Sequence, residues 1–150
     1  MDYNNTNELT NDERLFALLS HLSVVLGGIL MPIIIWAIQK DKSKFIRFHS
    51  LQAIFYNISI GVIIALIVII LAVLIALGAG FGALASGKGD PNAMPVLVLI
   101  LLFFFYGLIF LMIFAYIGYG IYLAVKSYGG ALIKIPVIGN IIYRKVYGNS

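Results

Sequence analysis

The sequence predicts an all-α, helical integral membrane protein with three transmembrane helices and a C-terminal interfacial segment. Only 11% of the 150 residues are charged, the mean hydropathy is +1.05, and uncharged apolar runs cover 15–38, 51–85 and 95–125. Each run exceeds the roughly 20 residues that a helix needs to cross the hydrocarbon core of a bilayer. A soluble domain of this size could not bury so much apolar surface, so we expect a single membrane domain.

An acidic tail, 1–11, precedes the first predicted helix at about 12–39. Asn11 and Asp12 are its expected caps, because short polar side chains accept hydrogen bonds from the free N–H groups at a helix start. A glycine pair and Pro32 interrupt the apolar run, and proline removes a backbone donor. The first helix is therefore expected either as a single kinked crossing or as a re-entrant hairpin, whose free backbone groups would need protein or water beside them.

The second helix is expected at about 43–78, with Ser43 as a possible cap. Glycines and an Asp-Pro pair indicate a loop after it. The third helix is expected at about 95–127, starting at a proline that suits a first turn and ending at a glycine pair. The remaining segment, 131–147, is basic and short for a span, which is typical of a segment that lies at the membrane interface.

Basic residues determine the predicted topology. Segments 40–49 and 126–150 each hold four Lys or Arg residues, whereas segment 78–94 holds one. Because Lys and Arg accumulate in short cytoplasmic loops, we expect the first two segments in the cytoplasm and 78–94 outside, with the protein in the cell membrane. The same basic segments are expected to contact anionic lipid, and no nucleic-acid partner is expected.

Small residues follow one face of the second predicted helix, within a sector of about 60° at 100° per residue. Small side chains let helices approach closely, and close approach drives helix association in lipid. We expect this helix-packing stripe to contact another helix of the same chain, with a seam between copies of the chain as the alternative. The stripe comprises Gly61, Ala65, Ala72, Ala76, Ala79 and Ala83.

A second pattern consists of polar side chains at membrane depth, where they are costly and often functional. His49 and Gln52 share one face of the second helix, and a bend in the first helix would let His21 meet them. The functional interpretation is a hydrated polar site or a proton-sensing pair of histidines, and the alternative is a set of hydrogen bonds that clasp helices together. The candidate polar site comprises His21, Ser23, Arg47, His49 and Gln52.

Signatures of enzymes are missing from the sequence. No acidic residue lies inside an apolar run, the chain has no cysteine, and it contains neither an H-E-x-x-H nor a G-x-S-x-G motif. Two histidines without nearby Cys, Asp or Glu make a poor metal site. We therefore expect no enzymatic activity, no cofactor and no bound metal.

Several short motifs resemble a small prokaryotic integral membrane family, a domain of unknown function regarded as distantly similar to the Tic20-type component of the chloroplast inner-envelope import machinery. The resemblance covers essentially the whole chain and implies an all-helical membrane protein. The motifs are Asn11-Asp12-Glu13-Arg14, His21-Leu22-Ser23, Pro32, Trp36, Phe45-Ile46-Arg47-Phe48-His49 and Gln52-Ala53.

These observations lead to two functional hypotheses. The first is a non-enzymatic subunit, or an assembly or translocation-associated factor, that interacts with other membrane proteins or with further copies of itself. The alternative is a small oligomeric channel or transporter with a polar path near His21, His49 and Gln52.

Overall fold

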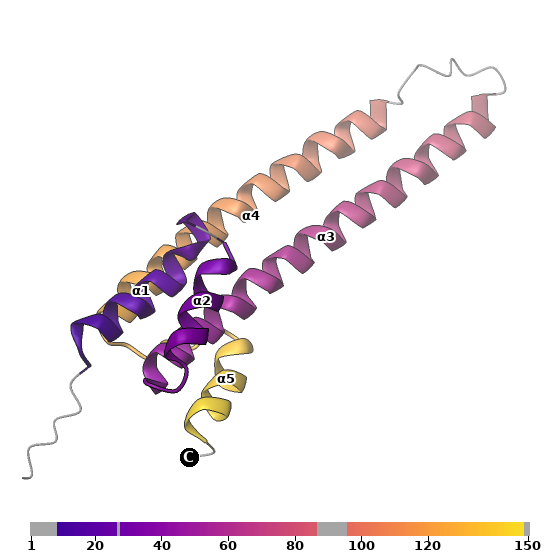
Figure 1. The fold of residues 1–150 in the computed structure, drawn as a ribbon. Helices are drawn as coiled ribbons and strands as arrows, with labels where there is room; N and C mark the ends of the chain where they lie inside the picture. The colour runs from indigo at the N-terminus through magenta and orange to yellow at the C-terminus, as the bar shows by residue number, and fades with distance from the viewer. Residues whose placement is uncertain (1–8, 27, 87–95, 149–150) are drawn as a thin grey trace, which may run out of the picture. The chain divides into compact units, whose positions relative to one another are not determined.

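The computed structural model describes residues 9–26, 28–86 and 96–148, without the side chains of 79, 81–86 and 97. These residues form five α-helices and no strand (Figure 1), which confirms the predicted all-α class. The chain divides into unit 1, Met1–Ser59 with Tyr116–Ser150, and unit 2, Ile60–Ala115. The helices are α1 (Asn11–Leu26), α2 (Leu30–Gln39), α3 (Lys44–Ser86), α4 (Val96–Tyr128) and α5 (Ile138–Tyr147).

The first apolar run forms two helices, α1 and α2, so of the two alternatives for 12–39 the structure has a broken run and not one continuous kinked helix. The N–H of Gly28 donates to the carbonyl of Ser23 at 2.6 Å, and Gly28 has a φ of 55°, a conformation that glycine adopts without steric cost. Helices α1 and α2 then contact each other. With 16 and 10 residues they are roughly 24 and 15 Å long, so neither reaches across a bilayer.

Pro32 was expected to kink or break one long helix, and in the structure it does neither. It occupies the first turn of α2, which begins at Leu30. A proline there costs little, because the N–H groups of the first turn have no partner within the helix. The break therefore occurs at Gly28, and two helices of the described chain, not three, are long and apolar enough to span a membrane.

Helix α1 begins with a capping box that the sequence analysis missed. The backbone N–H of Thr10 donates to the carboxylate of Glu13 at 2.9 Å, and the N–H of Glu13 donates to the Thr10 hydroxyl at 3.2 Å. These reciprocal bonds satisfy two free donors of the first turn. The expected caps Asn11 and Asp12 are therefore wrong, although the signature Thr-x-x-Glu at 10–13 is visible in the sequence.

Helix α3 begins where the sequence predicts, because the Ser43 hydroxyl accepts a hydrogen bond from the N–H of Ile46 at 3.3 Å. It continues to Ser86, through glycines that were expected to open a loop at 78. Each glycine costs a helix only about 1 kcal/mol, and in lipid an unpaired backbone group costs several times more. The rest of that expected loop, 87–94, lies outside the described residues.

Helix α4 ends at the predicted glycine pair in a Schellman motif. The N–H of Ala131 donates to the carbonyl of Lys126 at 3.2 Å, and the N–H of Gly130 donates to the carbonyl of Ser127 at 2.9 Å. Gly130 has a φ of 84°, which supplies the left-handed residue that this motif requires. The chain then runs without regular structure from Ala131 to the start of α5.

The core of unit 1 joins the beginning of α3 to α5. Phe48 and Leu51 of α3 pack against Ile142 and Val146 of α5, and Figure 1 shows the two helices side by side. The apolar face of α5 is therefore buried by its own chain. The sequence pattern does not reveal this packing surface on α3, and the interfacial location of segment 131–147 stays a prediction.

Helices α1 and α4 approach closely in unit 1. A Cβ atom at Gly120 of α4 would lie only 2.7 Å from Cγ2 of Val24. Real side chains do not come so near each other, so the contact requires glycine. Glycine in a membrane helix commonly permits such close approach of two backbones.

In unit 2, α3 and α4 expose most of their side chains. The less exposed face of α3 carries large aliphatic residues at spacings of three and four, which is the period of a helix-packing face. Near its end, the Cβ position of Gly78 lies 3.7 Å from Val98 of α4. The aliphatic face comprises Ile60, Ile64, Ile67, Leu71 and Ile75.

Candidate functional site

Two histidines meet in the interior of unit 1. Nε2 of His21 on α1 lies 3.1 Å from Nδ1 of His49 on α3, and the two rings are nearly perpendicular, at 83°. Each side chain is only 1% exposed. Because one neutral imidazole donates and the other accepts, the pair forms a single hydrogen bond that joins α1 to α3.

The surroundings of this pair favour uncharged rings. Phe45 and Phe48 lie against the His49 ring, with centroids 4.5 and 5.1 Å away. Burial lowers the pKa of His21 to about 4, since a charged imidazole loses its hydration in an apolar interior. The outer nitrogens, Nδ1 of His21 and Nε2 of His49, have no hydrogen-bond partner among the described residues.

Gln52 performs a different task one turn further along α3. Its amide NH₂ donates to the carbonyl of Ile133 at 3.0 Å, and its carbonyl oxygen accepts from the N–H of Ile135 at 2.8 Å. The fully buried side chain thus satisfies two backbone groups of the segment between α4 and α5. Since buried polar groups need partners, Gln52 fixes the path of this segment.

The other two predicted site residues do not join the histidines. The Ser23 hydroxyl donates to the carbonyl of Ser20 within its own helix, at 2.7 Å. Arg47 is half-buried, and its Nε has no partner among the described residues. The structure therefore brings His21 and His49 together and bonds Gln52 of α3 to the segment between α4 and α5. Ser23 and Arg47 lie in separate surroundings.

A polar contact between α3 and α4 was absent from the predicted site. The Tyr56 hydroxyl donates to the carbonyl of Tyr116 at 3.0 Å, and the Tyr116 hydroxyl donates to Oδ1 of Asn57 at 2.6 Å. The two tyrosine rings stack, with centroids 4.9 Å apart. Tyr116 resembles the other aromatic residues of α4 in sequence, and only the position of Asn57 opposite it distinguishes it.

Further contacts tie the beginning of α1 to the ends of α3 and α4. The Ser43 hydroxyl donates to the carboxylate of Glu13 at 2.6 Å, and this bond, with those from Thr10, lowers the pKa of Glu13. Arg14 donates to the carbonyl of Tyr128 at 3.5 Å. The start of α1 therefore lies at the same end of unit 1 as the start of α3 and the end of α4.

The described residues of the predicted helix-packing stripe lie on the exposed surface of α3. Gly61, Ala65, Ala72 and Ala76 are exposed, and nothing lies within 4 Å of a Cβ placed at Gly61. The side chains of Ala79 and Ala83 lie outside the described residues. In unit 2 the aliphatic face of α3 is less exposed than the face that carries the stripe. A role for the stripe in helix packing therefore stays a prediction.

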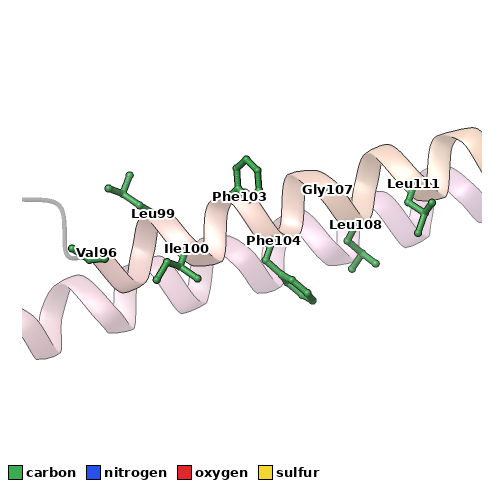
Figure 2. Close-up of a pocket in the computed structure, with 8 residues that line it drawn as sticks. All are labelled: Val96, Leu99, Ile100, Phe103, Phe104, Gly107, Leu108 and Leu111. Carbon is green, nitrogen blue, oxygen red and sulfur yellow. The ribbon is translucent and has the colours of Figure 1, made fainter.

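Unit 2 also contains a shallow apolar hollow along α4, with a volume of about 730 Å³. Figure 2 shows aliphatic and aromatic side chains around Gly107, with no nitrogen or oxygen among the side chains drawn. Such a lining suits an apolar occupant rather than a polar substrate. Among the described residues, no three His, Cys, Asp or Glu side chains are grouped to hold a metal ion.

Two long apolar helices, barely buried along their most apolar stretches, define this chain as a helical membrane protein. Residues 12–142 match the model of the MamF/MmsF family, described as the magnetosome magnetite crystal formation protein family, and the chain belongs to this family. No curated protein and no solved structure matches the chain. The expected similarity to the Tic20-type import component finds no support in these comparisons.

Proposed function

We propose that this protein is a non-enzymatic membrane subunit that acts by binding other membrane proteins through the exposed helices of unit 2. The exposed side chains of α4 carry this proposal.

The exposed face of α4 is rich in large aromatic residues. Phe103 is 84% exposed, and Tyr106 and Phe110 are 68% and 65% exposed. Aromatic side chains are enriched in protein interfaces, where they bury much area at little cost in conformational entropy. The neighbouring hollow around Gly107 offers a place where a helix of a partner can approach the backbone of α4.

The polar residues of unit 1 support this proposal over the channel alternative. His21 and His49 bond to each other, and Gln52 bonds to the backbone of the C-terminal segment. A conducting path needs polar groups that face water or the permeating ion. These three side chains are at most 1% exposed and serve as hydrogen-bond clasps, which favours a structural role for them.

The family description adds a biological setting. Its members are described by their part in magnetite crystal formation in the magnetosome. For this chain we infer a contribution at the level of the membrane, in which the protein assembles with or organises other membrane proteins.

Site-specific photocrosslinking in native membranes tests the proposal. A photoreactive residue at Phe103 or Phe110 of the full-length chain is expected to yield the same heteromeric adducts, because both positions lie on the exposed face. The matched control is Ile109, which is half-buried on the same helix and is expected to yield few adducts.

Two results would contradict the proposal. One is an identical set of adducts from all three positions, which would indicate random collision. The other is a set that contains only dimers of this chain, combined with ion conductance of the purified protein in liposomes, which would favour the oligomeric channel.

A further inference from the structure

Helix α5 has an outer side that its own chain leaves uncovered. Ile141 is 64% exposed, and Arg144 and Lys145 are also exposed. At about 100° per residue, Arg144 lies about 160° from both Ile142 and Val146, the residues that pack on α3. Ile141 and Arg144 lie about 60° apart, so an apolar and a basic side chain share the outer side.

The turn before α5 adds a second exposed apolar side chain. Val137 has φ 67° and ψ −62°, and the N–H of Ile138 donates to the carbonyl of Pro136 at 2.8 Å, which together describe a classic γ-turn. A β-branched residue is strained in this conformation. Even so, the Val137 side chain is 76% exposed, so burial within this chain does not compensate for the strain.

Packing behind the turn explains why the chain accepts this conformation. A Cβ at Gly139 would lie 2.6 Å from Cα of Lys134, so the first turn of α5 presses directly on the backbone of the preceding segment. Gln52 holds the same segment through the residues before and after Lys134, Ile133 and Ile135. The segment before the turn is therefore fixed by contacts from both α3 and α5, while the Val137 side chain is exposed.

The charged residues of the C-terminal segment itself have one sign. Residues 126–150 contain four basic residues and no acid. Lys134 Nζ lies 3.7 Å from the centroid of the Tyr143 ring, and Arg144 and Lys145 occupy the last turn of α5. Glu13 of α1 acts on the same turn, where burial first, then Tyr143 and then Glu13 raise the pKa of Tyr147 to about 12.

The position of α5 along α3 sets its depth. It packs on Phe48 and Leu51, four and seven residues after Lys44, where the candidate membrane span begins. At 1.5 Å per residue these contacts lie roughly 6 to 10 Å from the start of the span. This is the depth of the headgroups and the adjoining acyl chains, where amphipathic segments bind.

We propose that Val137, Ile141, Arg144 and Lys145 form a docking surface for anionic phospholipid. Val137 and Ile141 insert among the acyl chains next to the headgroups, while Arg144 and Lys145 bind the phosphates. The proposal depends on the membrane location of the chain and is independent of any protein partner. Arg and Lys close to the membrane surface are attracted to anionic headgroups.

The cysteine-free chain permits a direct test with an environment-sensitive fluorophore. The dye is attached to Val137→Cys or Ile141→Cys in purified full-length protein, in liposomes of phosphatidylcholine with or without phosphatidylglycerol. Lys42→Cys, on an exposed turn, provides the aqueous reference, and Ile63→Cys, exposed on α3 within the span, provides the hydrocarbon reference.

Both dyes on the outer side are expected to emit close to the hydrocarbon reference when phosphatidylglycerol is present, and doxyl groups near the headgroup should quench them. Arg144→Glu with Lys145→Glu should return their emission toward the Lys42 value and leave Ile63 unchanged. The proposal fails if both dyes emit like Lys42 when phosphatidylglycerol is present. It also fails if their emission changes neither with phosphatidylglycerol nor with the charge reversal.

Equal shielding of the dyes in micelles of a neutral detergent, which carries no phosphate, would also overturn it, because an apolar environment alone would then account for the emission. Shielding that appears only after native membrane extract is added would identify a protein as the occupant and would equally reject the lipid assignment. Neither result bears on the adducts formed by α4, so the two proposals can fail separately.

Discussion

The pair His21 and His49 shows how one residue type can join two helices in a water-poor interior. A neutral imidazole carries one donor and one acceptor, so two rings can bond without any third group. The hydrogen bond at 3.1 Å requires that at least one of the two facing ring nitrogens is unprotonated and can accept. If both rings became charged, the hydrogen bond would be lost and two positive charges would face each other.

We therefore expect the folded protein to lose stability in acid, between pH 6.5 and about 4. The pKa of His21 is lowered from 6.5 to about 4 in the fold, so the unfolded state binds the proton more readily across this range. The loss from His21 alone reaches about 3 kcal/mol at the lower limit, and above pH 6.5 its contribution is fully present. Reversible unfolding in mild detergent, measured at intervals of half a pH unit, checks this.

The double variant His21→Gln with His49→Gln provides the reference for this experiment, because the chain has two histidines. Its stability should change little between pH 6.5 and 4.5. Glu13, whose pKa lies below its ordinary value of 4.5, loses its contribution only at lower pH. A wild-type curve that parallels the double variant over this range would show that the imidazoles do not titrate as the burial requires.

At the scale of the element, glycines determine where helices stop and how closely they pack. Gly28 and Gly130 end α1 and α4 through positive φ values of 55° and 84°. Gly120 has a different role, since it lies inside α4, about two turns before its end, where Val24 of α1 comes close. The glycines at 78 and 80 neither end nor bend α3 in the structure, which continues to Ser86.

Gly120→Ala is expected to destabilise unit 1 by about 1–3 kcal/mol, the usual cost of overpacking. The added methyl would lie 2.7 Å from Cγ2 of Val24, and the stiff valine side chain cannot move aside easily. Gly118→Ala is the matched control, because it lies on the same helix with nothing within 4 Å of its Cβ position. Thermal unfolding in detergent should separate the two variants.

The control variant Gly118→Ala has an expected stability change of its own, and its sign is opposite to that of Gly120→Ala. Alanine favours a helix over glycine by about 1 kcal/mol, so Gly118→Ala should be neutral or stabilising. Equal melting temperatures for both variants would mean that α1 does not pack on α4 at Gly120.

At the scale of the whole molecule, the contacts of α1 extend the topology predicted from charge. Glu13 bonds to Ser43 and Arg14 to Tyr128, so α1 begins beside the two basic segments. With α1 and α2 packed together and neither long enough to cross, the N-terminal side of α1 belongs with 40–49 and 126–150. We expect all three on the cytoplasmic face and 78–94 on the opposite face.

Single cysteines at Asn11, Lys42, Ser86 and Ser150 test this arrangement with a membrane-impermeant maleimide. In intact cells only Ser86→Cys should react, and permeabilisation should expose the other three. Labelling of Asn11→Cys together with Ser86→Cys would restore a full crossing by the first apolar run. Labelling of Lys42→Cys or Ser150→Cys would reverse the topology, and protection of all four would contradict a location in the cell membrane.

Much of the architecture follows from the sequence because lipid imposes strong constraints on it. Apolar length predicts α3 and α4, since a backbone in hydrocarbon must satisfy its own hydrogen bonds and does so as a helix. The cap at Ser43 and the end of α4 at the glycine pair follow from local chemistry that involves only a few neighbouring residues. The candidate site was predictable only as far as its residue types, because polar side chains are conspicuous among apolar neighbours.

The tertiary structure decided what those side chains contact. The distance from His21 to His49 depends on the break between α1 and α2, and the role of Gln52 depends on the path of residues 131–135, which no periodicity describes. The apolar face of α5 could have faced lipid or protein, and only the presence of Phe48 and Leu51 beside it settled the choice. Local sequence determines which groups need partners, whereas the contacts between distant segments determine which partners they find.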